Sequence, residues 1–333
     1  MIALCTAWTN RSVNSGHRVS QAFRRITFGG NSSKRNITTL DRMVQPGDAV
    51  GTDMGVMHIG KKLGEGSYGA VFEAYWSTAG KTIAFKVEKP PEISSFENSP
   101  IVPRDFSRIT YELGVMLKFN GTYGFPLVYT ANMNGMFKYY AMQKLGKSLS
   151  ALRKEAGGRL TTRKVVRVAG EILDRLEVVH KKGFLMYDMH LGNFLLKDDV
   201  LFVIDLGMAF PYILNGRHIN QGNSFIPASY KNHIFASRMD SKGMIVSRRD
   251  ELERYLYLLV MLSEGSLPWS SHKETTKVIM HKLNSRIEDI CRDEAEWLTP
   301  AFEYVYSMRF DETPNYEFFR KLFRSKLKQL REL

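Results

Sequence analysis

Three short stretches carry the residue types that phosphoryl-transfer chemistry needs. The first is glycine-rich, and glycines let a backbone approach phosphate oxygens and point its amide groups at them. It reads Gly64-Glu65-Gly66-Ser67-Tyr68-Gly69-Ala70-Val71. Further along, Asp188 and Asn193 lie five positions apart, and Asp205 precedes Leu206-Gly207. Carboxylate and amide oxygens suit magnesium, which keeps its other positions for phosphate oxygens and water. Each stretch alone is weak, but their order and spacing together indicate a site for nucleotide phosphates and magnesium.

The remaining chemistry needs a cation and a base. Lys86 lies on the strand pattern that follows the glycine turn, where a lysine can bind the α- and β-phosphates of a nucleotide. We expect Glu112, on a predicted helix, to orient Lys86 through an ion pair. The carboxylate of Asp188 would accept or orient the proton of a substrate hydroxyl. Asn193 and Asp205 are the predicted magnesium ligands.

The elements that must position these residues change in type along the chain. The first half reads as strands, predicted at His58–Leu63, Ala70–Trp76, Thr82–Val87, Leu127–Ala131 and Lys138–Met142. One helix is predicted there, over 104–119. Beyond residue 160 apolar residues recur at helical spacing, which predicts helices over 165–179, 249–263, 275–289, 295–306 and 314–330. Short apolar runs before Asp188 and Asp205 predict two buried strands. We therefore predict an α+β fold with a small β-rich lobe, a larger helical lobe and a cleft between them.

The predicted domain covers residues 55–325, with the first lobe over about 55–144 and the second over about 145–325. Residues 1–54 form a basic extension that we expect to be disordered, because the first acidic residue is Asp41 and the composition is polar. Residues 326–333 are expected to be a short C-terminal tail. The basic start also resembles an organelle transit peptide, although its amphipathic pattern is poor.

Bulk composition narrows the class of protein. The 333 residues include 47 Lys and Arg against 34 Asp and Glu, a net charge of +13 that favours acidic partners. No apolar run approaches the roughly 20 residues that span a bilayer. Two cysteines give no disulfide framework, which indicates an intracellular, reducing environment. The sequence leaves cytoplasm, nucleus and mitochondrion open.

From about residue 58 to about 325 the chain resembles the casein kinase I family of protein Ser/Thr kinases, as a divergent member. The glycine turn, Asp188–Asn193 and Asp205–Gly207 carry the general kinase pattern. Four further blocks give the resemblance its specificity. They are Leu145-Gly146-Lys147-Ser148-Leu149, Ser247-Arg248-Arg249-Asp250-Glu251-Leu252-Glu253, Gly265-Ser266-Leu267-Pro268-Trp269 and Ser307-Met308-Arg309-Phe310-Asp311-Glu312-Thr313-Pro314-Asn315-Tyr316.

This resemblance implies a kinase that transfers phosphate from ATP, with Mg2+, to protein substrates that are acidic or already phosphorylated. Met142 matches the gatekeeper, and Gln143–Leu145 match the hinge whose backbone holds adenine. The implied ATP-binding residues are Gly64, Glu65, Gly66, Ser67, Gly69, Val71, Ala84, Lys86, Glu112, Met142, Gln143 and Leu145. Four basic residues could bind acidic substrates, or could simply form a solvated face: Arg238, Lys242, Arg248 and Arg249.

The chain departs from the family pattern at two positions beside the predicted base. Tyr187 stands where the family has an arginine that often reads activation-loop phosphate. His190 stands where the family has a lysine that contacts the γ-phosphate, and a neutral imidazole largely loses that cation. The activation segment around Lys231–Phe235 also lacks the family's Gly-Thr pair. A pseudokinase that serves as a nucleotide-binding scaffold is therefore the alternative. A nucleic-acid-binding module, which rests only on the charge and the N-terminal extension, is a distant third.

Overall fold

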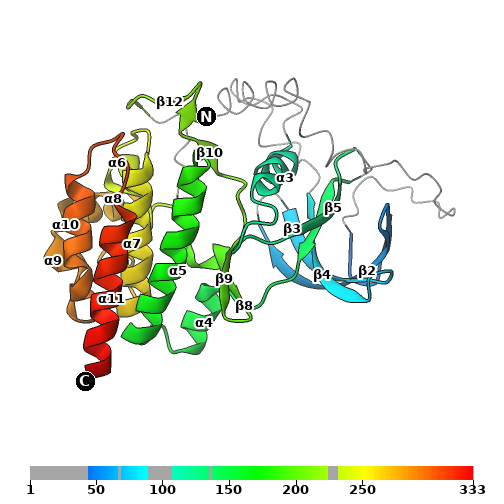
Figure 1. Ribbon diagram of the computed structural model, residues 1–333, viewed down its shortest axis with the longest axis horizontal. Coiled ribbons are helices and arrows are strands. Elements are labelled where there is room, and N and C mark those ends of the chain that lie inside the picture. Colours follow the sequence, from blue (N-terminus) through cyan, green and yellow to red (C-terminus); the bar gives the residue numbers. More distant parts are fainter. Residues whose placement is uncertain (1–43, 67–68, 89–106, 135–136, 224–231, 333) are drawn as a thin grey trace. The chain divides into compact units, whose positions relative to one another are not determined.

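A computed structural model of the chain describes residues 44–66, 69–88, 107–134, 137–223 and 232–332 (Figure 1). Tertiary contacts group the chain into two compact units, one ending at Leu145 and the other beginning at Gly146. Among the described residues, no helix has both the length and the apolar character needed to cross a lipid bilayer.

The first unit is built on one antiparallel sheet of six strands in the order β1-β2-β3-β4-β6-β5. One described helix, α3, belongs to the same unit (Figure 1). The elements are β1 (Ala49–Thr52), β2 (Gly55–Glu65), β3 (Gly69–Trp76), β4 (Lys81–Glu88), α3 (Arg108–Lys118), β5 (Val128–Asn132) and β6 (Tyr139–Gln143). All five predicted strands are present. Helix α3 lies within the predicted 104–119, of which residues 104–106 fall outside the described residues.

Strand β4 shows why these residues form the centre of the sheet. Its side chains alternate between two faces, as the pattern of the sequence predicts. Ile83, Phe85 and Val87 are fully buried in a cluster with residues of β2 and β3. Ala84 packs on the opposite face with residues of α3 and β6. Lys86 lies on the same face of β4 as Ala84, because the two residues are two positions apart. Strand β4 therefore places Lys86 on the α3 side of the sheet.

The second unit is mainly helical. Its longer helices are α4 (Leu149–Glu155), α5 (Thr162–Lys181), α7 (Arg248–Glu264), α8 (Thr275–Asn284), α10 (Thr299–Ser307) and α11 (Tyr316–Glu332). Shorter helical turns are η1 (Leu191–Asn193), α6 (Arg238–Ser241), α9 (Ile287–Ile290) and η3 (Asp293–Leu298). Short strands are β7 (Phe184–Leu185), β8 (Phe194–Lys197), β9 (Val200–Val203), β10 (Phe210–Pro211), β11 (Ile213–Leu214) and β12 (Arg217–His218).

Helix α7 forms the centre of this unit. All of its residues from Asp250 to Ser263 are buried, and α5 and α10 pack against it. Helix α11 packs against α5, and the two run side by side in Figure 1. Helix α7 begins at a capping box between Ser247 and Asp250 and ends at Gly265, which adopts φ 81°. A buried helix of this kind gives the site a rigid support.

The structure differs from the sequence prediction at four places. The predicted helix 275–289 is two helices, because Ser285 is extended and the Asp289 carboxylate caps a new turn at the Arg286 N–H. The predicted helix 295–306 begins as the 3-10 turn η3 and becomes α10 only at Thr299. Strand β1 lies in the extension that we expected to be disordered, of which 1–43 lie outside the described residues. Helix α11 continues through the predicted tail to Glu332.

Candidate active site

The glycine turn closes the hairpin between β2 and β3. Gly66 N–H donates to the carbonyl of Gly69 at 2.9 Å, and Ser67, a predicted ATP-binding residue, lies outside the described residues. At Gly69 an added Cβ would lie 2.5 Å from the carbonyl oxygen of Val87, so the packing of β3 on β4 requires glycine there. At Gly64 and Gly66 an added Cβ would meet nothing within 4 Å. The backbone at these two positions can therefore be approached by a phosphate.

Lys86 and Glu112 form the ion pair that the sequence predicts. The Lys86 ammonium lies 2.7 Å from both carboxylate oxygens of Glu112, and the two side chains are only 15% and 6% exposed. Tyr140, on β6 opposite Lys86, donates its hydroxyl to Glu112 Oε1 at 2.7 Å. Glu112 of α3, which the Tyr140 hydroxyl of β6 holds in place, thus fixes the orientation of the Lys86 side chain on β4.

Other predicted ATP-binding residues share this face of the sheet. Val71 pairs with Lys86 across β3 and β4, and Ala84 pairs with Met142 across β4 and β6. Directly paired residues point to the same face of an antiparallel sheet. Val71, Ala84 and Met142 therefore lie beside the ion pair and belong to one apolar cluster. Such a surface is suited to the apolar ring of a nucleotide base.

The predicted hinge follows directly on β6. Gln143 N–H donates to the carbonyl of Leu127 at 2.8 Å, and Leu145 is half-buried. Glu65, at the end of β2, pairs with Lys62 at 2.6 Å on the surface. The roles of Gln143, Leu145 and Glu65 in nucleotide binding stay predictions.

In the second unit, the β8–β9 hairpin brings the two predicted magnesium ligands together. Asn193 immediately precedes β8 and Asp205 follows soon after β9, and Ile204 N–H donates to the carbonyl of Asn193 at 2.9 Å. The Asn193 amide nitrogen donates to the carbonyl of Asp188 at 2.9 Å, which fixes the amide. Asn193 is buried, whereas Asp205 is exposed.

This donor set fits magnesium bound to a nucleotide. It offers one amide oxygen and one carboxylate, and phosphate oxygens with water would fill the remaining positions. No cluster of three or more His, Cys, Asp or Glu side chains that could hold a metal by itself occurs in the described ranges. The residues therefore fit a metal that arrives with its phosphate ligands.

Asp188 is half-buried near three charged or titratable neighbours, which are His190, Asp205 and Arg254. Its carboxylate lies 3.6 Å from His190 Nε2, which is too long for a hydrogen bond. The pKa of Asp188 is raised, mainly because burial disfavours the carboxylate; His190 and Arg254 lower it and Asp205 raises it. His190 Nδ1 accepts the N–H of Gly192 at 3.1 Å, so its Nε2 points toward Asp188. A raised pKa makes Asp188 a better proton acceptor.

Two residues at the site adopt a left-handed backbone that costs non-glycine residues about 1–3 kcal/mol. Tyr187, directly before Asp188, has φ 65°, and Asp205 has φ 56°. Such strain persists only where the surroundings enforce it, and it is concentrated at functional sites. At Tyr187 the enforcement comes from buried polar groups of α6 and α7.

Those groups are the part of the site that sequence reasoning missed. The Glu251 carboxylate accepts Tyr187 N–H at 2.8 Å and also binds His180 Nε2 at 2.8 Å. Arg254 donates to the carbonyl of Tyr187 and pairs with Asp240 at 2.5 Å, and its guanidinium lies 4.3 Å from the Tyr187 ring. The available signal was the dense charge of residues 248–254 at the start of α7, directly before the apolar run Tyr255–Leu262.

A pocket of about 520 Å³ lies beside residues 188–193, the predicted catalytic loop. It is lined by Ser150, Arg153, His190, Leu191, Gly192, Asn232, Phe235 and Met261. None of these residues is acidic.

Three of the four basic residues predicted to bind acidic substrates have structural contacts. Arg238 donates to the carbonyl of Ser285 at 2.6 Å, and Arg248 donates to that of Asp311 at 2.7 Å. Arg249 pairs with Asp250 at 3.3 Å. Lys242, which is exposed, is thus the better candidate of the four for contact with a substrate.

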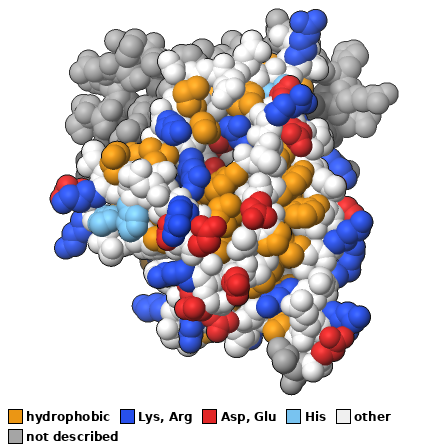
Figure 2. All heavy atoms as spheres, turned by 90° about the vertical axis from the view of Figure 1, so that its left-hand side faces the viewer, with side chains coloured by type: hydrophobic (Ala, Val, Ile, Leu, Met, Phe, Trp, Pro, Cys, Tyr) orange, Lys and Arg blue, Asp and Glu red, His pale blue; other side chains and the backbone are white. Residues whose placement is uncertain are grey.

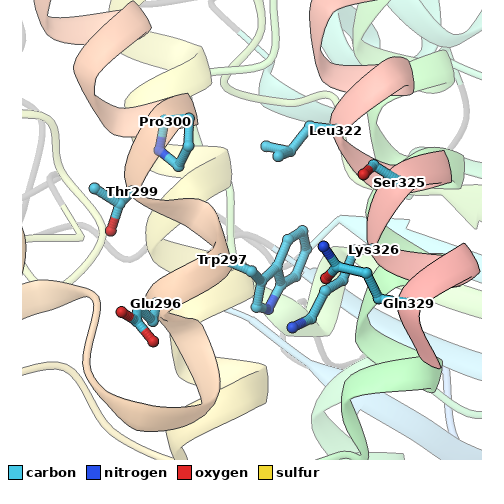
Figure 3. A pocket seen from close by; sticks show the side chains of 8 residues that line it. All are labelled: Glu296, Trp297, Thr299, Pro300, Leu322, Ser325, Lys326 and Gln329. Atoms are coloured by element: carbon cyan, nitrogen blue, oxygen red, sulfur yellow. The ribbon is translucent and has the colours of Figure 1, made fainter. Parts of the chain in front are cut away.

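The outer surface of the helical unit carries a different kind of feature. Figure 2 shows hydrophobic side chains bordered by acidic and basic ones, so this face is not a uniform basic patch of the kind that binds nucleic acid. A second pocket, of about 470 Å³, lies between η3, the start of α10 and α11, and the Trp297 ring projects into it (Figure 3). It contains none of the predicted site residues.

Comparison with known families agrees with this arrangement. Residues 57–222 match the family model of the protein kinase domain. The matched region runs from β2 through the glycine turn, Lys86, Glu112, the catalytic loop and Asp205. The chain has the two-lobed α+β fold of a protein kinase domain, and the match supports its place in the protein kinase family.

Proposed function

We propose that the chain is an ATP- and magnesium-dependent serine/threonine protein kinase that resembles casein kinase I. The observation that carries the proposal is the buried Lys86–Glu112 ion pair on the sheet face that also holds Val71, Ala84 and Met142. A lysine held in this way is prepared to bind nucleotide phosphates. Burying an ion pair costs desolvation free energy, which can cancel its contribution to stability. A functional role therefore explains this pair better than a purely structural role.

The proposed reaction assigns each residue a step. Lys86 and the backbone of the glycine turn bind the phosphates of ATP, and Asn193 and Asp205 hold the metal. When bound there, magnesium would supply positive charge to the transferring phosphoryl group. The substrate hydroxyl oxygen bonds to the γ-phosphorus while the bond from that phosphorus to the β–γ bridging oxygen breaks, which leaves ADP. Asp188 accepts the hydroxyl proton, and its raised pKa supports this role.

The proposed substrates are proteins with acidic or phosphorylated residues near the acceptor. The net charge of +13 and the pocket without acidic side chains support this preference. Charge reversal at Lys242 tests it, because among the described residues the Lys242 side chain makes no contact of the kind that Arg238 and Arg248 make. We expect Lys242→Glu to raise KM for an acidic peptide more than KM for a neutral one.

One observation favours the alternative of a pseudokinase. His190 stands where a catalytic-loop lysine is expected, and its Nδ1 is occupied by the Gly192 N–H. Loss of one preorganised charge contact costs about 10²–10³ in rate by analogy with oxyanion-hole deletions. This predicts a slow kinase if the other groups act, and a nucleotide-binding scaffold if they do not.

Phosphate transfer from labelled ATP to casein, with magnesium, tests the proposal. Wild type is compared with Asp188→Asn and Asp205→Ala at high enzyme concentration and long incubation. The proposal expects incorporation in wild type that both variants lose. Equal incorporation in all three samples, or none in any of them, contradicts it.

A further inference from the structure

The segment Asn232–Ala236 forms one wall of the pocket beside His190. Asn232 and Phe235 line that pocket together with residues of the catalytic loop and of α4. Whatever fixes the backbone of this segment therefore fixes the shape of the pocket. Its structure is a single turn, in which the carbonyl of Asn232 accepts the N–H groups of Phe235 and Ala236 at 3.1 and 2.8 Å.

Two buried side chains hold three further carbonyls of this segment. The Lys282 ammonium, from α8, donates to the carbonyls of His233 and Ala236, the latter at 2.6 Å. The Trp269 indole N–H donates to the carbonyl of Ile234 at 2.8 Å. Lys282 and Trp269 are both fully buried. We call this pair of donors the carbonyl clamp.

The residues that follow the segment are anchored as well. Ser237 donates its hydroxyl to Asp250 at 3.0 Å, and the Glu253 carboxylate accepts the N–H of Arg238 at 3.0 Å. Both carboxylates lie on α7, the buried central helix. Loop backbone normally satisfies its polar groups with water. Here side chains of the core do so, which makes the segment a rigid part of the unit.

A lysine in this position requires an explanation, because lysine is almost never fully buried unless it is paired. Burial lowers the pKa of Lys282 to about 7; Glu253 and Asp240 oppose this shift, and Arg254 adds to it. The ammonium has three N–H donors and the neutral amine has two. Either form can therefore hold the two carbonyls. An apolar side chain would fill the same space without desolvation, so the two hydrogen bonds are what the lysine supplies.

We propose that Lys282 is a positioning residue that holds the Asn232–Ala236 segment, and with it the wall of the pocket beside His190, in the conformation that receives the protein substrate. This inference rests on the proposed kinase function. It assigns Lys282 an effect on substrate recognition, although the side chain is buried and does not line the pocket. Trp269 helps to hold the same segment through its hydrogen bond to the carbonyl of Ile234.

The test compares Lys282→Met, which keeps the volume and removes the donors, with Lys277→Met on the same helix. Lys277 is 61% exposed and pairs only with Glu274 at the surface in the described contacts. Trp269→Phe is a milder variant that removes one donor and keeps a ring, in case Lys282→Met does not fold. Two quantities are measured: hydrogen exchange of the Phe235 and Ala236 amides, and the kinetics of phosphate transfer to an acidic serine peptide.

For Lys282→Met we expect faster exchange of both amides and a KM for the peptide about tenfold higher, equivalent to about 1.4 kcal/mol. KM for ATP and kcat should change by less than about twofold, a split that general destabilisation does not produce. Trp269→Phe should shift exchange and peptide KM in the same direction, and Lys277→Met should shift neither.

Unchanged exchange in Lys282→Met would remove the clamp itself. Faster exchange with an unchanged peptide KM would show that the segment does not serve substrate binding. Absence of phosphate transfer by wild type refutes the proposed function, and with it the substrate-positioning role; the exchange measurement then still decides whether Lys282 holds the segment.

Discussion

Replacement of Glu112 by glutamine tests the buried ion pair of the first unit. The change keeps the shape of the side chain and an oxygen for the Tyr140 hydroxyl, but it removes the charge that orients Lys86. A hydrogen bond to a charged group contributes about 1.5–3 kcal/mol. If that energy holds Lys86 in its catalytic position, kcat/KM should fall about 10- to 150-fold, since about 1.4 kcal/mol corresponds to a factor of ten.

The matched control is Glu274→Gln, the same chemical change in an exposed ion pair. Glu274 and Lys277 are 63% and 61% exposed, and such pairs contribute about 0–1 kcal/mol. The assay is the initial rate of phosphate transfer to casein at several ATP concentrations, with melting temperatures measured in parallel. A folded Glu112→Gln protein with the activity of wild type would refute the reasoning. Equal losses in both variants would show that charge in general, rather than this pair, is responsible.

Three further outcomes are expected. His190→Lys should raise kcat by about tenfold or more, because it restores a cation beside Asp188; a lower kcat would show that the imidazole packs in a way that lysine cannot. Asp205→Ala should abolish the thermal stabilisation that ATP with magnesium gives wild type, which is about 2.7 kcal/mol at a ligand concentration of 100 Kd; stabilisation equal to that of wild type would remove its metal role. The pKa of Asp188 is raised, chiefly by burial, and only its carboxylate form can accept a proton. Activity should therefore fall on acidification at a pH above the ordinary aspartate pKa of about 3.9, and a profile flat down to that pH would contradict the assignment.

The sequence was most informative where a local pattern determines the structure. Apolar residues alternate with Ala84 and Lys86 in the sequence of β4, and the structure buries Ile83, Phe85 and Val87 on one face with Lys86 on the other. The pairing of Lys86 with Glu112 was also predicted, because a strand lysine that binds phosphates needs a helical glutamate to orient it, and the structure contains this ion pair.

Most other contacts between distant elements could not be predicted from the sequence. Nothing local indicates that Tyr140 donates to Glu112, or that Arg254 and Glu251 of α7 enforce the backbone of Tyr187. The break between α8 and α9 was missed for a related reason. The helical pattern continues across Ser285, but the Asp289 carboxylate caps a new turn at Arg286, and this alternative is visible only in the folded chain.

The central claim is that Asp188 and its neighbours transfer phosphate to serine or threonine. Mass spectrometry of casein after incubation with ATP, magnesium and either wild type or Asp188→Asn tests that claim most directly. We predict phosphorylated Ser or Thr residues in the sample treated with wild type and none above background in the other. Phosphorylation at equal levels in both samples, or in neither, would contradict the account.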